Sequence, residues 1–240
     1  MTLEQKVVVD GIVYPVLLSD EEETLSAAKA AGRVSVAILR EGQTEMISGA
    51  EYAVELPEEI PEEILIPYLE RVVRRQLHLP WNICETERLT IREFSIEDAG
   101  KILKEPEDTQ ADAVFYTPEL LASYIRNQYR FYEYGIWAVV RKADGVIVGT
   151  AGLTQWEPQE GLPEGMGEVR EWGEGLDFSL ELGYHIFRPY RRRGYAEEVC
   201  RAILAWAKAE YGCPVWAKVK PDNTGSVRLL EKLGIPYWKI

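Results

Sequence analysis

The sequence predicts an α/β protein built of two parts. Three observations support this: strand-like and helix-like runs alternate along the chain, composition and pattern shift near Pro80-Trp81, and residues 180–211 read as a strand, a glycine-containing turn and a helix. A chain of 240 residues is long enough for one large domain or two modest ones. We predict a small α/β domain over residues 1–80 and a second domain over residues 84–240.

The first domain is predicted from its periodicity. Residues 12–18 and 34–39 are rich in apolar and β-branched side chains and predict strands, with residues 51–56 as a third strand beside them. Between the first two, Ser19 can cap a helix that acidic residues open and Gly32 ends. A second helix is predicted over residues 67–77, with Pro67 in its first turn.

The second domain begins with a strand over residues 89–94. Ser95 and Asp98 then form a helix-opening pair, and Thr117-Pro118 starts a further helix. Residues 136–140 and 146–153 flank Asp144-Gly145, which is a strong hairpin signal. Residues 214–220 are the last clear strand.

The turn between residues 187 and 197 is the most informative local pattern. It reads Arg191-Arg-Arg-Gly-Tyr-Ala196, after a strand over residues 180–187 and before a helix over residues 197–211. A helix that opens directly after a strand presents unpaired backbone N–H groups and the positive end of its dipole. Guanidinium groups also suit phosphate oxygens. The turn therefore predicts an anion site, for which pyrophosphate is the usual ligand.

Several motifs in register resemble one known family. Arg191-x-x-Gly194-x-Ala196 resembles the phosphate-loop signature of the GNAT N-acetyltransferase superfamily. The following segments are similar to its ribosomal-protein N-terminal acetyltransferase branch: Glu85 to Phe94, Glu181-Leu-Gly-Tyr184, Arg188-Pro-Tyr190, Asn223-x-x-Ser226 and Glu231-Lys-Leu-Gly234. The resemblance covers roughly residues 84 to 240. It is specific for the cofactor and weak for the acceptor.

The resemblance implies a mixed, splayed central sheet and acetyl-CoA as cosubstrate, with no metal. The backbone of the phosphate loop would hold the pyrophosphate, while the end of the preceding strand and an asparagine would pair with the pantetheine arm. The residues implied are Ile186, Phe187, Arg188, Arg191, Arg192, Arg193, Gly194, Tyr195, Ala196, Asn223 and Ser226. Gly194 and Ala196 are small where the chain must approach phosphate closely.

Acetyl transfer to an amine needs a base, because most amines are protonated at neutral pH. Glu181 matches the family's strand glutamate and is our candidate base, although a charge within an apolar strand can also serve only to pair with an arginine. His185 lies on the same strand face and is a secondary candidate for relaying a proton. Many family members place a Tyr where this chain has Leu230, so Ser226 or water would protonate the leaving thiolate.

Composition restricts the remaining function classes. The net charge of −13 argues against a nucleic-acid binder. It favours a cationic or amine acceptor, although soluble proteins without such a function often carry the same bias, which is the slightly preferred interpretation. No apolar run approaches the ~20 residues that span a bilayer, and the start of the chain does not read as a signal peptide. Three scattered cysteines fit reduced thiols. We expect a cytoplasmic protein that acts on a small-molecule amine or a peptide N-terminus, without a membrane partner, and possibly as a homodimer.

Three further expectations concern the less regular parts of the chain. Residues 155–176 form a loop rich in Gly and Glu that either floats in solvent or forms an acidic wall of the acceptor site, with Trp156 and Trp172 as contacts. Residues 17–32 resemble a strand–helix unit of haloacid-dehalogenase-type phosphatases without an Asp-x-Asp motif, which indicates an accessory role for the first domain. Residues 236–240 supply at most one short strand where the family has two.

Two alternatives to the enzyme remain open at this stage. The missing Tyr, the short ending and the extra domain also fit a non-catalytic module that binds acetyl-CoA. A plain nucleotide-binding fold is weaker, because it leaves the Asn223 motif unexplained.

Overall fold

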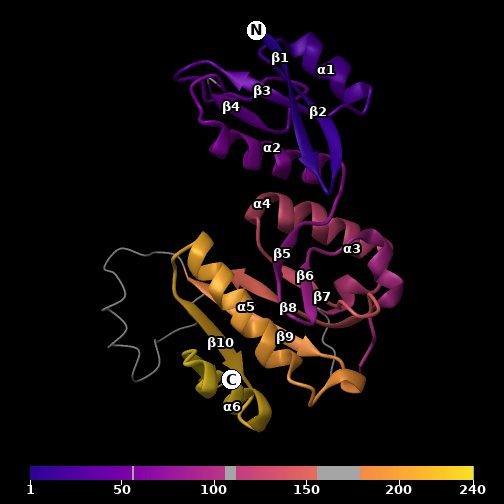
Figure 1. Cartoon of the computed structure of the whole chain (residues 1–240), viewed down its shortest axis with the longest axis vertical. Helices are drawn as coiled ribbons and strands as arrows, with labels where there is room; N and C mark the ends of the chain where they lie inside the picture. The colour runs from indigo at the N-terminus through magenta and orange to yellow at the C-terminus, as the bar shows by residue number, and fades with distance from the viewer. Residues whose placement is uncertain (56, 106–111, 156–178, 240) are drawn as a thin grey trace. The chain divides into compact units, whose positions relative to one another are not determined.

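The computed structural model describes residues 1–55, 57–105, 112–155 and 179–239 (Figure 1). The chain divides into two compact units, Met1–Trp81 and Asn82–Ile240, and each has its own sheet. Most of the loop expected over residues 155–176, including its glutamates and both tryptophans, lies outside the described residues.

The first unit is a four-stranded sheet in the order β1-β2-β3-β4 with two helices. β1 and β2 form an antiparallel hairpin, whereas β2, β3 and β4 run parallel. The elements are β1 (Thr2–Val9), β2 (Ile12–Ser19), α1 (Glu22–Ala30), β3 (Ser35–Leu39), β4 (Ala53–Glu55) and α2 (Glu62–Gln76). The core of the unit is formed by strand valines and isoleucines packed against the apolar face of α2.

Two features of this unit differ from the sequence expectation. β1 was not predicted, although Asp10-Gly11 joins it to β2 with φ values of 51° and 79°, the left-handed conformation that such a turn requires. α2 begins at Glu62, which places Pro67 inside the helix instead of in its first turn. Pro67 lacks the N–H for a helical hydrogen bond, and burial of Leu65, Leu69 and their neighbours offsets that loss.

The second unit is a seven-stranded mixed sheet in the order β11-β10-β9-β8-β7-β6-β5. β5 to β9 are antiparallel to their neighbours, whereas β9, β10 and β11 run parallel. The strands are β5 (Asn82–Glu85), β6 (Leu89–Arg92), β7 (Ile136–Arg141), β8 (Ile147–Gln155), β9 (Leu180–Ile186), β10 (Val215–Val219) and β11 (Tyr237–Lys239). α5 (Tyr195–Glu210) lies across one face of this sheet (Figure 1).

The predicted start signals of this unit are present. A 3₁₀ helix over Ile96–Lys101 follows Ser95, whose backbone N–H donates to Asp98. Thr117 caps α3 (Pro118–Tyr124) by accepting from the Leu120 N–H, and the helix continues through a π turn into α4 (Arg130–Tyr132). Asp144-Gly145 joins β7 to β8, and α6 (Thr224–Leu233) precedes β11. β5 is an additional strand before the one that the sequence predicts.

Across the described ranges, no helix is both long enough and apolar enough to cross a membrane.

Candidate functional site

The neighbouring parallel strands β9 and β10 of the second sheet separate soon after they meet. β9 and β10 share two register pairs, Leu180 with Val215 and Glu181 with Trp216, and the described remainder of each strand is not paired with the other. We call the diverging stretch beyond Glu181 and Trp216 the β9–β10 fork. Hydrogen-bonding groups on the β10 side of β9 therefore lack strand partners there, as an added-strand ligand requires.

Strand geometry identifies which backbone groups face the fork. The Leu180 N–H donates to Pro214 O on the β10 side, whereas the Phe187 N–H donates to Val148 O on the β8 side. Because direction alternates along a strand, the backbone groups of Tyr184 and Ile186 point toward the fork. This corrects the expectation for Phe187, since its N–H is bonded to Val148 and its carbonyl accepts from the Tyr190 N–H.

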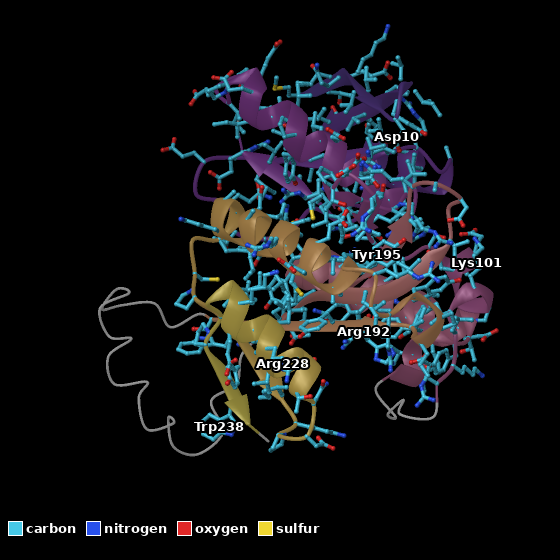
Figure 2. The ribbon with its side chains drawn as sticks, turned by 60° about the horizontal axis from the view of Figure 1, so that its bottom comes forward. Asp10, Lys101, Arg192, Tyr195, Arg228 and Trp238 are labelled. Atoms are coloured by element: carbon cyan, nitrogen blue, oxygen red, sulfur yellow. The ribbon has the colours of Figure 1, made fainter. Side chains whose placement is uncertain are left out.

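The predicted phosphate loop opens α5 as expected from its residues. Gly194 is the N-cap of α5 at φ 81°, and Arg192 also has positive φ at 62°. Figure 2 labels Arg192 and Tyr195, which lie on either side of this N-cap in the sequence. The first N–H groups of α5 have no acceptor within the helix and lie at the positive end of its dipole. Arg192 and Arg193 are exposed. The backbone of residues 194–197 thus presents donors that fit a pyrophosphate.

Arg88, the residue before β6, bonds to this turn and to the first turn of α5. Its guanidinium donates to Arg193 O at 3.0 Å and to the Glu198 carboxylate at 2.7 Å, and it lies 4.7 Å from the centre of the Tyr195 ring. Thr86 also bonds Glu198, at 2.5 Å. Burial acts to raise the pKa of Glu198, but these bonds and the Arg88 charge hold the pKa below its ordinary value. The negative charge of Glu198, which lies beside the candidate anion site, is thereby balanced by the positive charge of Arg88.

A buried carboxylate, Glu105, joins the phosphate loop to β9. It binds the Arg191 guanidinium at 2.6 Å and His185 Nε2 at 2.8 Å, and it accepts from the backbone N–H of Arg188. Arg191 also donates to Ile186 O at 2.7 Å. His185 therefore belongs to a cluster around Glu105, and the Arg188 N–H expected to face pantetheine is already bonded. The sequence gives no signal for Glu105, because it is eighty residues from His185.

The candidate base forms an ion pair, as in the alternative interpretation of the sequence, but its partner is a lysine instead of an arginine. Glu181 Oε2 lies 2.9 Å from Lys218 Nζ, and the two side chains are 21% and 24% exposed. Glu181 stands at the point where β9 and β10 part, because it is the last residue of β9 that is paired with β10. The predicted catalytic residues Glu181 and His185 share a strand, but they have different partners.

Two hydroxyl groups face each other where α6 begins. Asn223 caps α6 by accepting from the Ser226 N–H at 3.1 Å, which leaves its side-chain NH2 group able to donate elsewhere. Tyr184 lies beside Ser226 and beside Cys200 of α5: burial raises the pKa of Tyr184 to about 12, the Ser226 side chain acts to lower it, and the Cys200 thiol adds to the rise. Leu230 is buried and carries no donor.

The three free cysteines, Cys84, Cys200 and Cys213, all lie in the second unit. Burial raises the pKa of Cys84 and of Cys200 to about 12, which leaves neither thiol a ready nucleophile. In the part of the chain that the structure describes, no group of three His, Cys, Asp or Glu side chains is arranged to hold a metal ion.

Comparison with known proteins agrees with this arrangement. Residues 88–235 match the family model described as "Acetyltransferase (GNAT) domain". The chain is 28% identical over 99 residues to the uncharacterized N-acetyltransferase YjdG of Bacillus subtilis, a match that covers 41% of this chain and 49% of that protein. It is 24% identical over 159 residues to the uncharacterized N-acetyltransferase p20 of Bacillus licheniformis, covering 62% and 79%. The chain thus spans about half of YjdG.

Solved structures give weaker likenesses. A GNAT-family acetyltransferase from Bacillus anthracis superposes with a TM-score of 0.45 at 20% identity, over 63% of this chain and 81% of that one. The ribosomal-protein-S5-alanine acetyltransferase of Vibrio fischeri gives a TM-score of 0.45 at 18% identity, over 62% and 80%.

Proposed function

We propose that this chain, which belongs to the GNAT family of acetyltransferases by the match of residues 88–235, moves an acetyl group directly from acetyl-CoA to a primary amine. The observation that carries the proposal is the β9–β10 fork lying next to the helix start at Gly194. A ligand with a pyrophosphate at one end and an amide-bearing arm at the other fits both features at once.

The cofactor-binding roles follow from groups described above. Backbone N–H groups from Gly194 to Glu197 would hold the pyrophosphate, with Arg192 and Arg193 adding positive charge. The backbone of Tyr184 and the N–H of Ile186, whose carbonyl already accepts from Arg191, would pair with the arm, and the Asn223 NH2 group would donate to it. Acetyl-CoA supplies the activated acyl group when it is bound. Direct transfer is favoured over an acyl-cysteine because loss of solvent contact raises the pKa of all three cysteine thiols above the ordinary value.

Glu181 is proposed as the base that takes the proton of the acceptor amine. Its position where the strands part gives it access to an amine that approaches the thioester end of the arm. Lys218 competes for the same carboxylate, so an acceptor ammonium would have to replace Lys218 before proton transfer. His185 is proposed to hold the phosphate loop through Glu105, instead of relaying protons.

The acceptor is proposed to be a small amine or a peptide N-terminus. A net charge of −13 attracts cations, and the relatives named N-acetyltransferases are in keeping with an amine. A cytoplasmic location and a homodimer remain proposals from the sequence. The first unit is proposed to be an accessory domain.

The Glu181–Lys218 ion pair favours one second candidate, a non-catalytic module that binds acetyl-CoA. The Lys218 ammonium, 2.9 Å from the Glu181 carboxylate, occupies the group that an acceptor amine would have to reach. In that function the fork and the phosphate loop would be used for binding alone.

Calorimetric titration with CoA and acetyl-CoA tests the cofactor site first. Wild type should bind saturably, while Arg193→Glu and Gly194→Trp should bind at least about tenfold more weakly, because they add negative charge and a side chain at φ 81° to an anion site. Arg126→Glu makes the same charge change on an exposed residue elsewhere and should bind like wild type. Failure of folded wild type to bind would reject both candidates.

Thiol release then separates the two candidates. Acetyl-CoA is supplied with panels of N-terminal peptides, polyamines and other small amines, and free CoA is measured over time. Acceptor-dependent release that Glu181→Gln abolishes supports the enzyme. Tight binding with no release across the panels supports the binding module.

A further inference from the structure

Gly183 is a glycine in the middle of β9 that neither its backbone conformation nor its packing explains. Its φ is outside the positive range that favours glycine. Among the described residues, a Cβ atom at this position would meet only Ile136 Cδ1 within 4 Å, at 3.5 Å, which is ordinary van der Waals contact. Glycine in the interior of a strand weakens the strand, and it often marks a place where a ligand approaches closely.

Two other glycines in this part of the sheet do have a packing reason. A Cβ atom on Gly149 would collide with the carbonyl oxygen of His185, and a Cβ atom on Gly152 would collide with the carbonyl oxygen of Gly135. Gly183 is paired with Gly152 across the sheet, but no backbone lies in the way of its own Cβ position. Gly183 is also partly exposed, although β9 is an inner strand. We call the open space over it the Gly183 gap.

The Gly183 gap lies on the face of the sheet that is opposite α5. β8 and β9 pair without a register shift along the whole of β9, so successive side chains of β9 alternate between the two faces. The side chain of Tyr184 lies beside Cys200 of α5, which places Gly183 and Glu181 on the other face. The two residues are separated by about 7 Å along the strand.

That face already holds one alkyl ammonium at Glu181. Lys218 reaches it from β10, and its Nζ lies 2.9 Å from Glu181 Oε2. A lysine side chain ends in an unbranched CH2–NH3⁺ group, so the structure shows the kind of ammonium that this carboxylate accommodates. An acceptor that replaced Lys218 would bring the carbons next to its amine toward Gly183, because Gly183 is the next residue of β9 on the same face.

Direct transfer requires the cofactor and the acceptor to be bound at the same time. In the proposed binding mode CoA lies in the β9–β10 fork and at the helix start at Gly194, while α5 lies across one face of the sheet (Figure 1). The face that carries the Gly183 gap is therefore left for the acceptor.

We propose that the carbon bearing the acceptor amine lies in the Gly183 gap, beside Ile136, so that Gly183 selects primary amines on an unbranched CH2 group. This inference rests on the proposed acetyl transfer. A branched carbon would need more room than the gap leaves beside Ile136. Two sources share the selected chemistry: the N-terminal glycine of a peptide, and an alkyl amine such as a lysine side chain.

A titration of wild type with amines tests the site without turnover. Butylamine and tert-butylamine are added to the free protein, and the amide signal of Gly183 is followed by nuclear magnetic resonance. Butylamine should shift that signal saturably, and tert-butylamine should bind at least about tenfold more weakly, because its amine is on a branched carbon. Gly183→Val should lose the saturable binding of butylamine, since its side chain fills the gap.

Gly183→Ala tests the same site in the reaction. Its kcat/KM for butylamine and for a peptide that begins with glycine should fall about tenfold to a hundredfold, because the added methyl group takes the place of the acceptor carbon. CoA affinity should stay as in wild type, and resistance to denaturant should be equal or higher, since alanine fits the backbone there.

Gly100→Ala is the matched control. It adds the same methyl group at a glycine of the second unit whose Cβ position has no described atom within 4 Å, and it should keep wild-type values. In wild type, transfer to the glycine peptide alone would identify a peptide N-terminus as the source, and transfer to butylamine alone would identify an alkyl amine. Either result supports the selected chemistry.

Three outcomes would overturn the proposal and leave the proposed function standing. The first is wild-type kcat/KM in Gly183→Ala. The second is loss of CoA affinity in folded Gly183→Ala, which would assign the gap to the cofactor. The third is equal transfer by wild type to butylamine and tert-butylamine. Absence of CoA binding by folded wild type would remove the proposed function as well.

Discussion

Lys218 and Glu181 share an ion pair at the point where β9 and β10 separate, and its effect on chemistry is opposite to its effect on folding. A partly exposed pair of this kind contributes at most about 1 kcal/mol to stability, because solvent screens both charges. In the proposed mechanism the pair matters more, since the ammonium would have to leave before the carboxylate accepts a proton. One side chain therefore decides how readily the proposed base works.

We expect Glu181→Gln to lower kcat by about 10²- to 10⁴-fold, the usual contribution of a positioned base, with CoA affinity unchanged. Lys218→Met should raise kcat/KM for a weak amine acceptor, because the competing ammonium is gone. Steady-state kinetics with CoA calorimetry check both. Glu210→Gln, an exposed carboxylate at the end of α5, is the control. Unchanged kcat in Glu181→Gln would remove Glu181 from the mechanism.

At the scale of elements, the residue before β6 is bonded to the first turn of α5. Arg88 contacts Arg193, Tyr195 and Glu198 and thereby ties a strand to the helix start that would bind phosphate. The same guanidinium cancels the negative charge of Glu198 in the first helical turn. The anion site thus depends on a residue about one hundred positions earlier in the chain.

Arg88→Ala should weaken CoA binding about tenfold, because the Glu198 charge is then exposed beside the pyrophosphate. Adding Glu198→Gln should restore most of the affinity by removing that charge. Calorimetry of the four proteins in this double-mutant cycle gives the coupling between the two sites. Purely additive losses would show that Arg88 acts on something other than Glu198.

The 3₁₀ turn after β6 has a buried acid at its start. Asp98 is fully buried and receives hydrogen bonds from Arg92 at 2.6 and 3.0 Å and from the Ser95 N–H. Burial acts to raise the pKa of Asp98, but these bonds and the charge of Arg92 lower it below its ordinary value. A depressed folded-state pKa stabilises the fold above the unfolded value near 4, and that contribution is lost as pH falls through the folded value.

Asp98→Asn should therefore lower the free energy of unfolding by about 2 kcal/mol near neutral pH, leaving Arg92 without its charged partner. The gap between wild type and variant should shrink as pH falls below about 4, because Asp98 of the unfolded chain then takes up a proton before Asp98 of the folded protein does. Urea titrations from pH 7 to pH 3 measure this. Asp222→Asn, on an exposed residue, should show little change. A gap independent of pH would contradict the charge-based account.

How far sequence reasoning reached depended on the range of the interactions. Local signals such as Thr117, Asp144-Gly145 and the Gly194 turn placed their elements correctly, because capping and positive φ are set within a few residues. β1 was missed although the Asp10-Gly11 turn signal was present. The start of α2 was predicted five residues too late, because Pro67 was taken for the first turn of a helix that burial of its apolar face extends back to Glu62. Glu105, Lys218 and the role of Arg88 arise only from tertiary contacts that no local pattern records.

At the scale of the whole molecule, the two units have separate cores. Leu69, which is fully buried, belongs to the core of the first unit, whereas every described residue of the candidate site lies in the second. The composition shift at Pro80-Trp81 lies at the same place as the division between the units. The net charge of −13 belongs to the chain as a whole and bears on its ligands more than on its fold.

Leu69→Ala should cost the first unit about 2–5 kcal/mol, the usual effect of a cavity in a packed core, and should leave CoA affinity unchanged. Denaturant unfolding followed by circular dichroism should show one transition shifted to a lower denaturant concentration than in wild type. CoA binding should persist until the second transition, in which the second unit unfolds. Loss of CoA affinity in the folded variant would mean that the first unit contributes to the site.

The β9–β10 fork also sets a length. From Glu181, where the strands are still joined, to Ile186 at the end of β9 is five residues, or about 17 Å along an extended strand. A thread-like ligand anchored at the phosphate loop meets the closed end of the fork after that distance. In the proposed binding mode, the pairing of Glu181 with Trp216 would limit the length of the acyl group: a short acyl group would end before the strands join, and each added carbon of a longer chain would have to separate them further.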